Sequence, residues 1–249
     1  MRILLCGCQG RMGHAVADAA KDGAVIAAGV DAIWSERAFP VYATPADCTE
    51  DIDVIIDFSN PAALDSILAY AVEKGVPAVI CTTGLSDEQM HAVFDASQRV
   101  PVFFSGNMSL GIGLLTALTK KAAAVLGEDF DIEILEMHHN QKLDAPSGTA
   151  LMLADAAKAG LAYEPRYVYT RHDRREKRGD KEIGISAIRG GNIIGEHQVI
   201  FAGKDEVINL THRAQSRALF ATGALRAARF LIGKPAGLYN MEDLMADVL

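Results

Sequence analysis

The sequence has few of the residues that build disulfide-stapled or metal-stapled proteins. It contains four cysteines in 249 residues, and Cys6 and Cys8 have no histidine or cysteine partner at zinc-ligand spacing. Free thiols in a reducing compartment are therefore the favoured interpretation of Cys6, Cys8, Cys48 and Cys81. The sequence predicts neither a structural metal nor a catalytic one.

Long apolar runs are also missing. We find no apolar stretch of the ~18 residues that cross a membrane as a helix, and the N-terminal MRILLCGCQG lacks the apolar core of a signal peptide. Basic residues are outnumbered, with 24 Lys and Arg against 32 Asp and Glu and a net charge of −8. General nucleic-acid binding needs a basic face. We therefore expect a soluble, cytoplasmic protein that binds neither nucleic acid nor membranes.

The composition that remains is that of an ordinary globular protein. Hydrophobic residues make up 50% and charged residues 22% of the chain, which argues against wholesale disorder. A chain of 249 residues can form one large domain or two modest ones. Because the net charge is negative, an anionic ligand must be attracted by a local cationic pocket rather than by the whole molecule.

A glycine-rich turn follows the first apolar run. Residues 1–31 predict a strand, a turn with Gly7, Gly10 and Gly13, a helix, and a second strand that ends at Asp31. Gly7 would permit the sharp turn, Gly10 the close approach of a pyrophosphate and Gly13 close packing of the helix. The helix N-terminus would bind phosphates and Asp31 the ribose hydroxyls. We predict nucleotide binding, with a merely tight strand-to-helix turn as the alternative.

Short strands and helices alternate up to about residue 105, which indicates an α/β fold with a parallel sheet. In such a sheet the carboxyl ends of the strands line the ligand cleft. Small polar residues stand at five successive predicted strand ends: Cys8-Gln9-Gly10, Asp31, Ser59-Asn60, Thr82-Thr83 and Ser105-Gly106-Asn107. Any one of these could be a plain loop, but five in succession favour a cofactor cleft.

The pattern becomes strand-rich after about residue 130, and we interpret this change as a domain boundary. The helix predicted over Ser216–Ile232, with Ser216 as its N-cap, would pack on the first domain. The charge run Arg171–Lys181 predicts a solvated loop, with a mobile flap near an anionic ligand as the alternative.

Glu136–Ala150 carries the densest set of chemically active residues. Backbone N–H groups and hydroxyls at Ser147-Gly148-Thr149, where a helix starts, predict an anion site. His138, His139 and Lys142 add positive charge or protons, so we predict a pocket for a small acid with more than one carboxylate. Adjacent strand residues point to opposite faces, and either histidine could be purely structural. A third metal ligand at suitable spacing is missing.

These motifs together resemble one known family. GCQGRMG, DFSNP, CTTGL, FSGNMSLG and EMHHNQKLDAPSGTA are similar to 4-hydroxy-tetrahydrodipicolinate reductase, also called dihydrodipicolinate reductase, of lysine and diaminopimelate biosynthesis. The resemblance runs through almost the whole chain and includes IRGGNIIGEHQVIF and THRAQSR. It implies reduction of 4-hydroxy-tetrahydrodipicolinate to tetrahydrodipicolinate by NADH or NADPH.

The resemblance also implies a two-domain architecture. A Rossmann-like parallel-sheet domain would comprise residues 1–108 and 216–249. A smaller α+β domain, residues 109–215, would hold an open, mostly antiparallel sheet, bind the substrate and form a homotetramer. Two domains would close on hinges near residues 106–112 and 211–217.

Residue roles follow from the matching motif positions. His138 would be the proton donor or acceptor and Lys142 the proton donor, and which of them is the acid stays open. His139, Gly148 and Thr149 match substrate-binding positions, with Ser147 beside them at the helix start. The cofactor-binding positions are Gly7, Cys8, Gln9, Gly10, Arg11, Met12, Asp31, Cys81, Thr82, Thr83, Ser105, Gly106, Asn107 and Met108.

Departures from the family pattern bear on the cofactor. Ala32 follows Asp31 where some members carry an arginine for the 2′-phosphate of NADPH. We therefore expect NADH to be used at least as well as NADPH, with Arg11 the nearest residue that could compensate. The alternatives are another two-domain NAD(P) oxidoreductase, such as a semialdehyde or homoserine dehydrogenase relative, and a nucleotide-sensing regulator without enzymatic activity.

Overall fold

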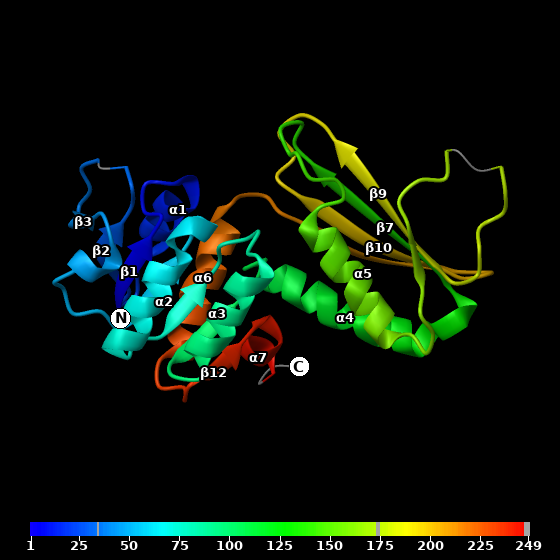
Figure 1. Ribbon diagram of the computed structural model, residues 1–249. Coiled ribbons are helices and arrows are strands. Elements are labelled where there is room, and N and C mark those ends of the chain that lie inside the picture. The colour runs from blue at the N-terminus through cyan, green and yellow to red at the C-terminus, as the bar shows by residue number, and fades with distance from the viewer. Residues whose placement is uncertain (34, 173–174, 247–249) are drawn as a thin grey trace. The chain divides into compact units, whose positions relative to one another are not determined.

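The computed structural model describes residues 1–33, 35–172 and 175–246 (Figure 1). The described chain forms two compact units. Unit 1 comprises Met1–Ser109 and the described part of the segment that begins at Arg217, and unit 2 comprises Leu110–Ser216. The chain thus leaves unit 1 once and returns to it once.

Unit 1 is built on a parallel sheet of seven described strands in the order β12-β6-β5-β4-β1-β2-β3. The strands are β1 Arg2–Cys6, β2 Val25–Val30, β3 Val41–Tyr42, β4 Val54–Asp57, β5 Ala78–Ile80, β6 Pro101–Phe104 and β12 Gly237–Tyr239. The strand order reverses between β1 and β4, as in a doubly wound nucleotide-binding sheet. The predicted Rossmann-like fold is confirmed, although the short strands β3 and β12 were not predicted from the sequence.

Helices cover both faces of this sheet (Figure 1). They are α1 Arg11–Ala19, α2 Leu64–Lys74, α3 Asp87–Ser97, α6 Ala218–Leu231 and α7 Met241–Met245, with 3-10 turns η1 Pro45–Asp47 and η2 Pro61–Ala63. Helix α6 packs on α1 and on strands β4, β5 and β6, so the C-terminal helix joins the first unit as predicted. The helix starts two residues after Ser216, and its N-cap is Arg217.

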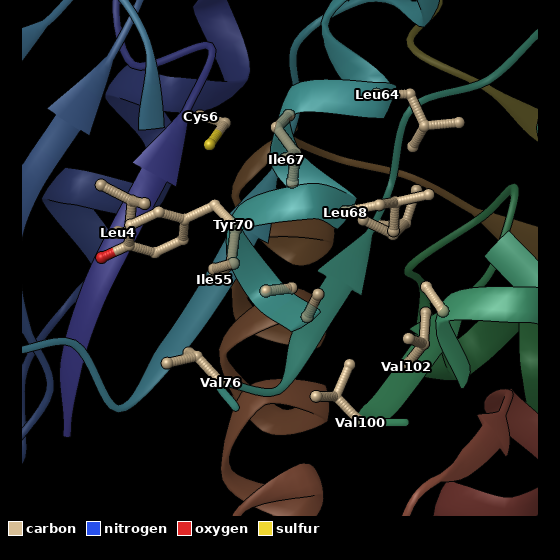
Figure 2. Packing of buried hydrophobic residues seen from close by; sticks show 14 of the residues in the cluster. Leu4, Cys6, Ile55, Leu64, Ile67, Leu68, Tyr70, Val76, Val100 and Val102 are labelled. Carbon is tan, nitrogen blue, oxygen red and sulfur yellow. The ribbon is translucent and has the colours of Figure 1, made fainter. Parts of the chain in front are cut away.

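One apolar core of unit 1 lies between the sheet and helices α2 and α3 (Figure 2). Leu4, Ile55 and Val102 from the strands meet Ile67 and Leu68 from α2. Each such side chain stabilises the folded state by roughly 1.5–3 kcal/mol when it is fully buried. This core fixes the strands whose carboxyl ends form the edge described below.

The four cysteines are buried and free. Burial raises the pKa of the Cys6 and Cys81 thiols well above its ordinary value, so these two thiols stay protonated and unreactive. The free thiols predicted from the spacing are confirmed.

Unit 2 holds a mixed sheet of five described strands in the order β11-β10-β7-β9-β8. The strands are β7 Asp131–His138, β8 Arg166–Val168, β9 Glu182–Arg189, β10 Glu196–Ala202 and β11 Val207–Arg213. Strand β10 is antiparallel to β7 and β11, whereas β9 is parallel to β7 and β8. The expectation of a mostly antiparallel sheet is therefore only half correct. The long crossover through α5 Gly148–Gly160 allows β7 and β9 to run in the same direction.

Helices α4 Leu110–Leu126 and α5 pack on each other and on this sheet, and the turn η3 Gly127–Asp129 extends α4. The helical stretch Leu110–Asp129 is long and apolar enough to cross a membrane by length and composition. The sequence shows no uninterrupted apolar stretch of this length, because Lys120 and Lys121 interrupt the apolar run without ending the helix. A single helix of this kind is weak evidence for a membrane span, because core helices of soluble proteins pass the same test.

Two arginines of the charge run are held by acidic residues of the sheet. Arg171 contacts Glu133 at 2.8 Å and Glu182 at 2.6 Å, and Arg178 contacts Asp131 at 2.6 Å and Glu133 at 3.0 Å. These partners include the first residues of β7, at the opposite end of that strand from His138. Arg171 and Arg178 are therefore anchored at the end of the sheet opposite His138, and residues 173–174 of the charge run lie outside the described residues.

Candidate functional site

The first candidate site is a cleft at the carboxyl edge of the unit 1 sheet. It encloses about 320 Å³ near the ends of β1, β2 and β4. Its lining includes the predicted cofactor residues Gly7, Gln9, Gly10 and Asp31, together with Ser59. This is the strand-order reversal at which parallel sheets bind ligands.

The glycines of the cleft have separate structural roles. Gly7 has a φ of +75°, and a Cβ there would lie 2.5 Å from the carbonyl oxygen of Phe58. A Cβ on Gly13 would lie 2.3 Å from the carbonyl oxygen of Gly7, so Gly13 lets α1 pack against the turn, as its position predicted. Gly10 is the N-cap of α1 and provides no side chain there. The first N–H groups of the helix are therefore open to a phosphate.

Asp31 is fixed at the end of β2 by two backbone donors. Its Oδ2 accepts the N–H of Gln9 at 2.9 Å, and its Oδ1 accepts the N–H of Ile33 at 3.1 Å. The Gln9 side chain donates to the carbonyl oxygen of Ser35 at 2.9 Å and accepts from its hydroxyl at 2.8 Å. A glycine turn, an open helix N-terminus and an oriented carboxylate fit the adenosine half of a dinucleotide.

The remaining predicted cofactor residues divide into two groups. Cys81 to Thr83 and Ser105 to Met108 follow β5 and β6 on the same edge of the sheet, but they do not line the 320 Å³ cleft. Cys8, Arg11 and Met12 belong to the turn and first helix and are not among the lining residues either. Cys8 is buried, and its sulfur would lie 2.6 Å from a Cβ built on Gly29. Cys8 is therefore a packing residue of the turn.

A buried carboxylate ties the strand ends together. Asp57, the last residue of β4, accepts hydrogen bonds from the Ser59 hydroxyl at 2.5 Å and from the Thr82 hydroxyl at 2.7 Å. Burial raises the pKa of Asp57 against the opposing effect of these hydrogen bonds. Ser59 belongs to one of the polar strand ends predicted to line the cleft, whereas Asp57, the last residue of β4, was not predicted as a site residue.

The second candidate site lies at the end of β7 in unit 2. The alternation of β7 buries both Glu136 and His138 on the face covered by helices. Nδ1 of His138 lies 2.6 Å from Oε2 of Glu136. Arg189, paired with His138 in the register of β7 and β9, contacts the Glu136 carboxylate through Nη1 at 2.8 Å and Nη2 at 2.7 Å. The N–H of Ser147 completes the set at 2.9 Å.

These contacts keep Glu136 ionised. Burial alone would raise the pKa of Glu136, but hydrogen bonds from His138, Arg189 and Ser147 outweigh it and hold the pKa at about 2. The same carboxylate raises the pKa of Arg189. Glu136 and Arg189 therefore form a permanently charged pair beside His138.

Ser147 is turned into the protein instead of toward a ligand. Its N–H is bound to Glu136, and its hydroxyl oxygen accepts the N–H of Ala150 at 3.2 Å as the N-cap of α5. The same oxygen lies 3.0 Å from Nε2 of His197. These contacts engage both the N–H and the hydroxyl of Ser147 within the protein.

His197 stands edge-on to His138, with 5.1 Å between ring centroids. Burial, followed by the influence of His138, lowers the pKa of His197 to about 4. His197 is therefore neutral near pH 7, and which of Nε2 and the Ser147 hydroxyl donates in their contact depends on the ring nitrogen that carries the proton. Arg189 and His197 come from strands far along the chain, and only the fold reveals them. Glu136 had a sequence signal, because it precedes His138 by the strand period of two.

The other predicted residues lie in the turn after β7. The N–H of Lys142 donates to the carbonyl oxygen of His139 at 3.2 Å. Lys142 Nζ lies 2.9 Å from Oδ1 of Asp144, and its side chain keeps 24% of its exposure. His138 is buried, whereas His139 is half-buried beyond the strand end. Among the described residues, no group of three or more His, Cys, Asp and Glu side chains could hold a metal ion.

Comparisons with known proteins cover both units. Residues 1–108 match the family model for the N-terminus of dihydrodipicolinate reductase, and residues 111–245 match the model for its C-terminus. The 4-hydroxy-tetrahydrodipicolinate reductase of Caldanaerobacter subterraneus subsp. tengcongensis is 51% identical over 247 residues, which cover 98% of each chain. The Clostridium tetani protein of the same name is 46% identical and covers 98% of this chain and 97% of its own.

Solved structures agree with these relatives. A dipicolinate-bound dihydrodipicolinate reductase from Paenisporosarcina sp. TG-14 is similar with a TM-score of 0.78 and 25% identity, covering 100% of this chain and 99% of that one. An aspartate dehydrogenase from Thermotoga maritima is similar with a TM-score of 0.53 and 15% identity, covering 94% and 98%. The second likeness shows a common fold alone.

Proposed function

Because this chain belongs to the dihydrodipicolinate reductase family, we propose that it reduces 4-hydroxy-tetrahydrodipicolinate to tetrahydrodipicolinate with NADH or NADPH, in lysine and diaminopimelate biosynthesis. The observation that carries the proposal is the match of both units to one reductase family over nearly the whole chain. The same observation argues against the semialdehyde, homoserine dehydrogenase and regulator alternatives.

Unit 1 is proposed to bind the cofactor, and unit 2 the substrate. The adenosine half of the dinucleotide would occupy the 320 Å³ cleft, with its phosphates at the start of α1 and a ribose at Asp31. The nicotinamide, which supplies the hydride, would lie along the ends of β5 and β6, near Thr82-Thr83 and Ser105 to Met108. The polar residues at these strand ends support this placement of the nicotinamide.

In unit 2, a dicarboxylate is proposed to bind at the start of α5. The N–H groups of Gly148 and Thr149 would receive one carboxylate, because helix N-termini stabilise anions. His139 and Lys142 would add positive charge. The dipicolinate bound to the Paenisporosarcina protein supports a substrate with two carboxylates. Lys142 or Nε2 of His138 would deliver the proton to the carbon next to the one that accepts the hydride.

Closure and assembly belong to the same proposal. The chain passes between the units at 109/110 and at 216/217, within or next to the proposed hinges at 106–112 and 211–217. The face of the unit 2 sheet that carries Glu133, Leu135 and Met137 is only half-buried, which supports a homotetramer formed through that sheet. We further propose that the enzyme is soluble and cytoplasmic.

The test is a coupled assay in which the substrate is generated enzymatically and oxidation of NADH or NADPH is followed at fixed enzyme concentration. We expect oxidation only when the dicarboxylate substrate is being formed. Dipicolinate should bind more tightly when NADH is present. Binding of NADH with no effect of any dicarboxylate would instead favour the regulator alternative.

A further inference from the structure

We propose that Glu136, clamped by Arg189 and Ser147, is a positioning residue that keeps the proton of His138 on Nδ1 and reserves Nε2 for proton transfer. The inference deepens the proposed function, because transfer from Nε2 assumes that His138 acts on the substrate. The tautomer itself is a property of unit 2 alone and can be measured without turnover.

Four hydrogen-bond donors surround the Glu136 carboxylate. Oε1 of Glu136 accepts from Ser147 N–H at 2.9 Å and from Arg189 Nη2 at 2.7 Å. Oε2 faces Arg189 Nη1 at 2.8 Å and His138 Nδ1 at 2.6 Å. An ionised carboxylate only accepts hydrogen bonds. Nδ1 of His138 must therefore carry a proton to make its contact.

Arg189 and Ser147 hold the Glu136 carboxylate rigidly. Arg189 meets the carboxylate through both terminal nitrogens, and Nη2 also donates to the carbonyl oxygen of Asp144 at 2.5 Å. The N–H of Ser147 is fixed by the start of α5. Arginine is planar and always charged, so it holds the plane of a carboxylate that it binds through two nitrogens. Glu136 is thereby held in one orientation, and His138 with it.

The Nε2 edge of the His138 ring is the edge that faces away from Glu136. A Cβ placed on Gly195 would lie 3.1 Å from Nε2 of His138, so this glycine leaves the Nε2 edge uncrowded. His197 packs edge-on to the ring, and its own Nε2 is engaged with the Ser147 hydroxyl. A proton that enters or leaves His138 does so at Nε2, while the Nδ1 proton stays in place. Glu136 does not take up that proton, because its four acceptor positions are already filled.

The substitution Glu136→Gln should move the proton of the neutral His138 ring from Nδ1 to Nε2. A glutamine has one oxygen and one NH2 group where the glutamate has two oxygens. Two obligate donors, Ser147 N–H and Arg189 Nη2, face Oε1, whereas Arg189 Nη1 alone faces Oε2 beside His138. The glutamine oxygen therefore faces Ser147, and its NH2 faces His138 and gives up the contact with Arg189 Nη1. Nδ1 must then accept, and the proton of the neutral ring moves to Nε2. The matched control is Glu133→Gln, on the same strand with arginine partners but on the opposite face of the sheet.

The experiment records ¹⁵N spectra of histidine-labelled full-length protein without substrate, on the alkaline side of the imidazole titration, with His138→Gln to assign the signals. We expect the Nδ1–H tautomer in the wild type, Glu133→Gln and Glu136→Asp, and the Nε2–H tautomer in Glu136→Gln. An Nε2–H tautomer in the wild type overturns the proposal even if no variant folds. An unchanged tautomer in Glu136→Gln overturns it as well.

Kinetics then separate this inference from the proposed function. Glu136→Gln should lower kcat by ~10²–10⁴-fold, the usual contribution of a positioned acid or base, with the KM for NADH unchanged. Glu136→Asp should restore part of kcat, because it keeps the carboxylate. Inactive wild type with the expected tautomers would refute the proposed function and leave the positioning role standing. If Glu136→Gln kept the kcat of the wild type although its His138 carried the proton on Nε2, the role of Nε2 in proton transfer would be refuted.

Discussion

Acidification from pH 6.5 to pH 4 should destabilise the protein through His197. The pKa of this buried histidine is lowered from 6.5 to about 4, first by burial and then by the neighbouring His138. Between these two values the unfolded chain binds a proton at His197 that the folded chain does not bind. The contribution of His197 to the free energy of unfolding is therefore fully present above pH 6.5. It decreases as the pH falls and is lost at about pH 4.

The magnitude follows from the size of the shift. One pKa unit corresponds to about 1.36 kcal/mol, so a decrease from 6.5 to about 4 corresponds to about 3 kcal/mol of unfolding free energy. Such a loss is a substantial part of the ~5–15 kcal/mol by which folded proteins are stable. Glu136 adds a second loss at lower pH, because its pKa of about 2 lies below the ordinary 4.5.

The assay is urea unfolding followed by circular dichroism at a series of pH values, for the wild type and for His197→Gln. Other groups titrate in both proteins, so the difference between the two curves isolates His197. We expect the wild type to lose about 3 kcal/mol more than the variant between pH 6.5 and pH 4. His172→Gln, at an exposed position of the same unit, should follow the wild type. Parallel curves for wild type and His197→Gln would refute the reasoning.

Three further predictions concern packing, catalysis and the cofactor. Gly223→Ala should lower the unfolding free energy in urea by ~1–3 kcal/mol, because its Cβ would lie 1.7 Å from the Met108 carbonyl oxygen. Gly190→Ala is the control, since among the described residues nothing lies within 4 Å of its Cβ, and equal stabilities would contradict the packing argument. Lys142→Ala should reduce kcat by ~10²–10⁴-fold, and an unchanged kcat would remove Lys142 from the acid role. NADH should give a kcat/KM at least equal to that of NADPH because Asp31 repels a 2′-phosphate, and a much higher value with NADPH would contradict this.

The sequence predicts best those parts of the fold that local chemistry determines. The strand, glycine turn, helix and strand of residues 1–31 follow from nearby residues, and the structure contains them as β1, α1 and β2. The start of α3 depends on equally local contacts. Ser86 Oγ accepts the N–H of Gln89 at 3.3 Å, and the Gln89 side chain accepts the N–H of Ser86 at 3.1 Å.

The parts that escaped prediction depend on residues far apart in the chain. The direction of β9 relative to β7 has no local signature, so the parallel pairing was not expected. The surroundings of His138 are another case. Arg189 and His197 lie more than fifty residues away and reach it only because β9 and β10 flank β7. The contacts of the Ser147 hydroxyl are a third case, because the sequence marks a helix start but does not show which way the hydroxyl points.

The return of the chain to unit 1 has a consequence for synthesis. Helix α6 packs on β4, β5 and β6, and Phe230 of α6 meets Phe103 of β6 with 6.3 Å between ring centroids. The ribosome completes all of unit 2 before it makes α6, so this apolar face of the nascent sheet has no cover during about a hundred residues of elongation. Unit 2, by contrast, is one continuous segment and can fold as soon as it emerges. A chain stalled before Arg217 should therefore need chaperone protection for unit 1.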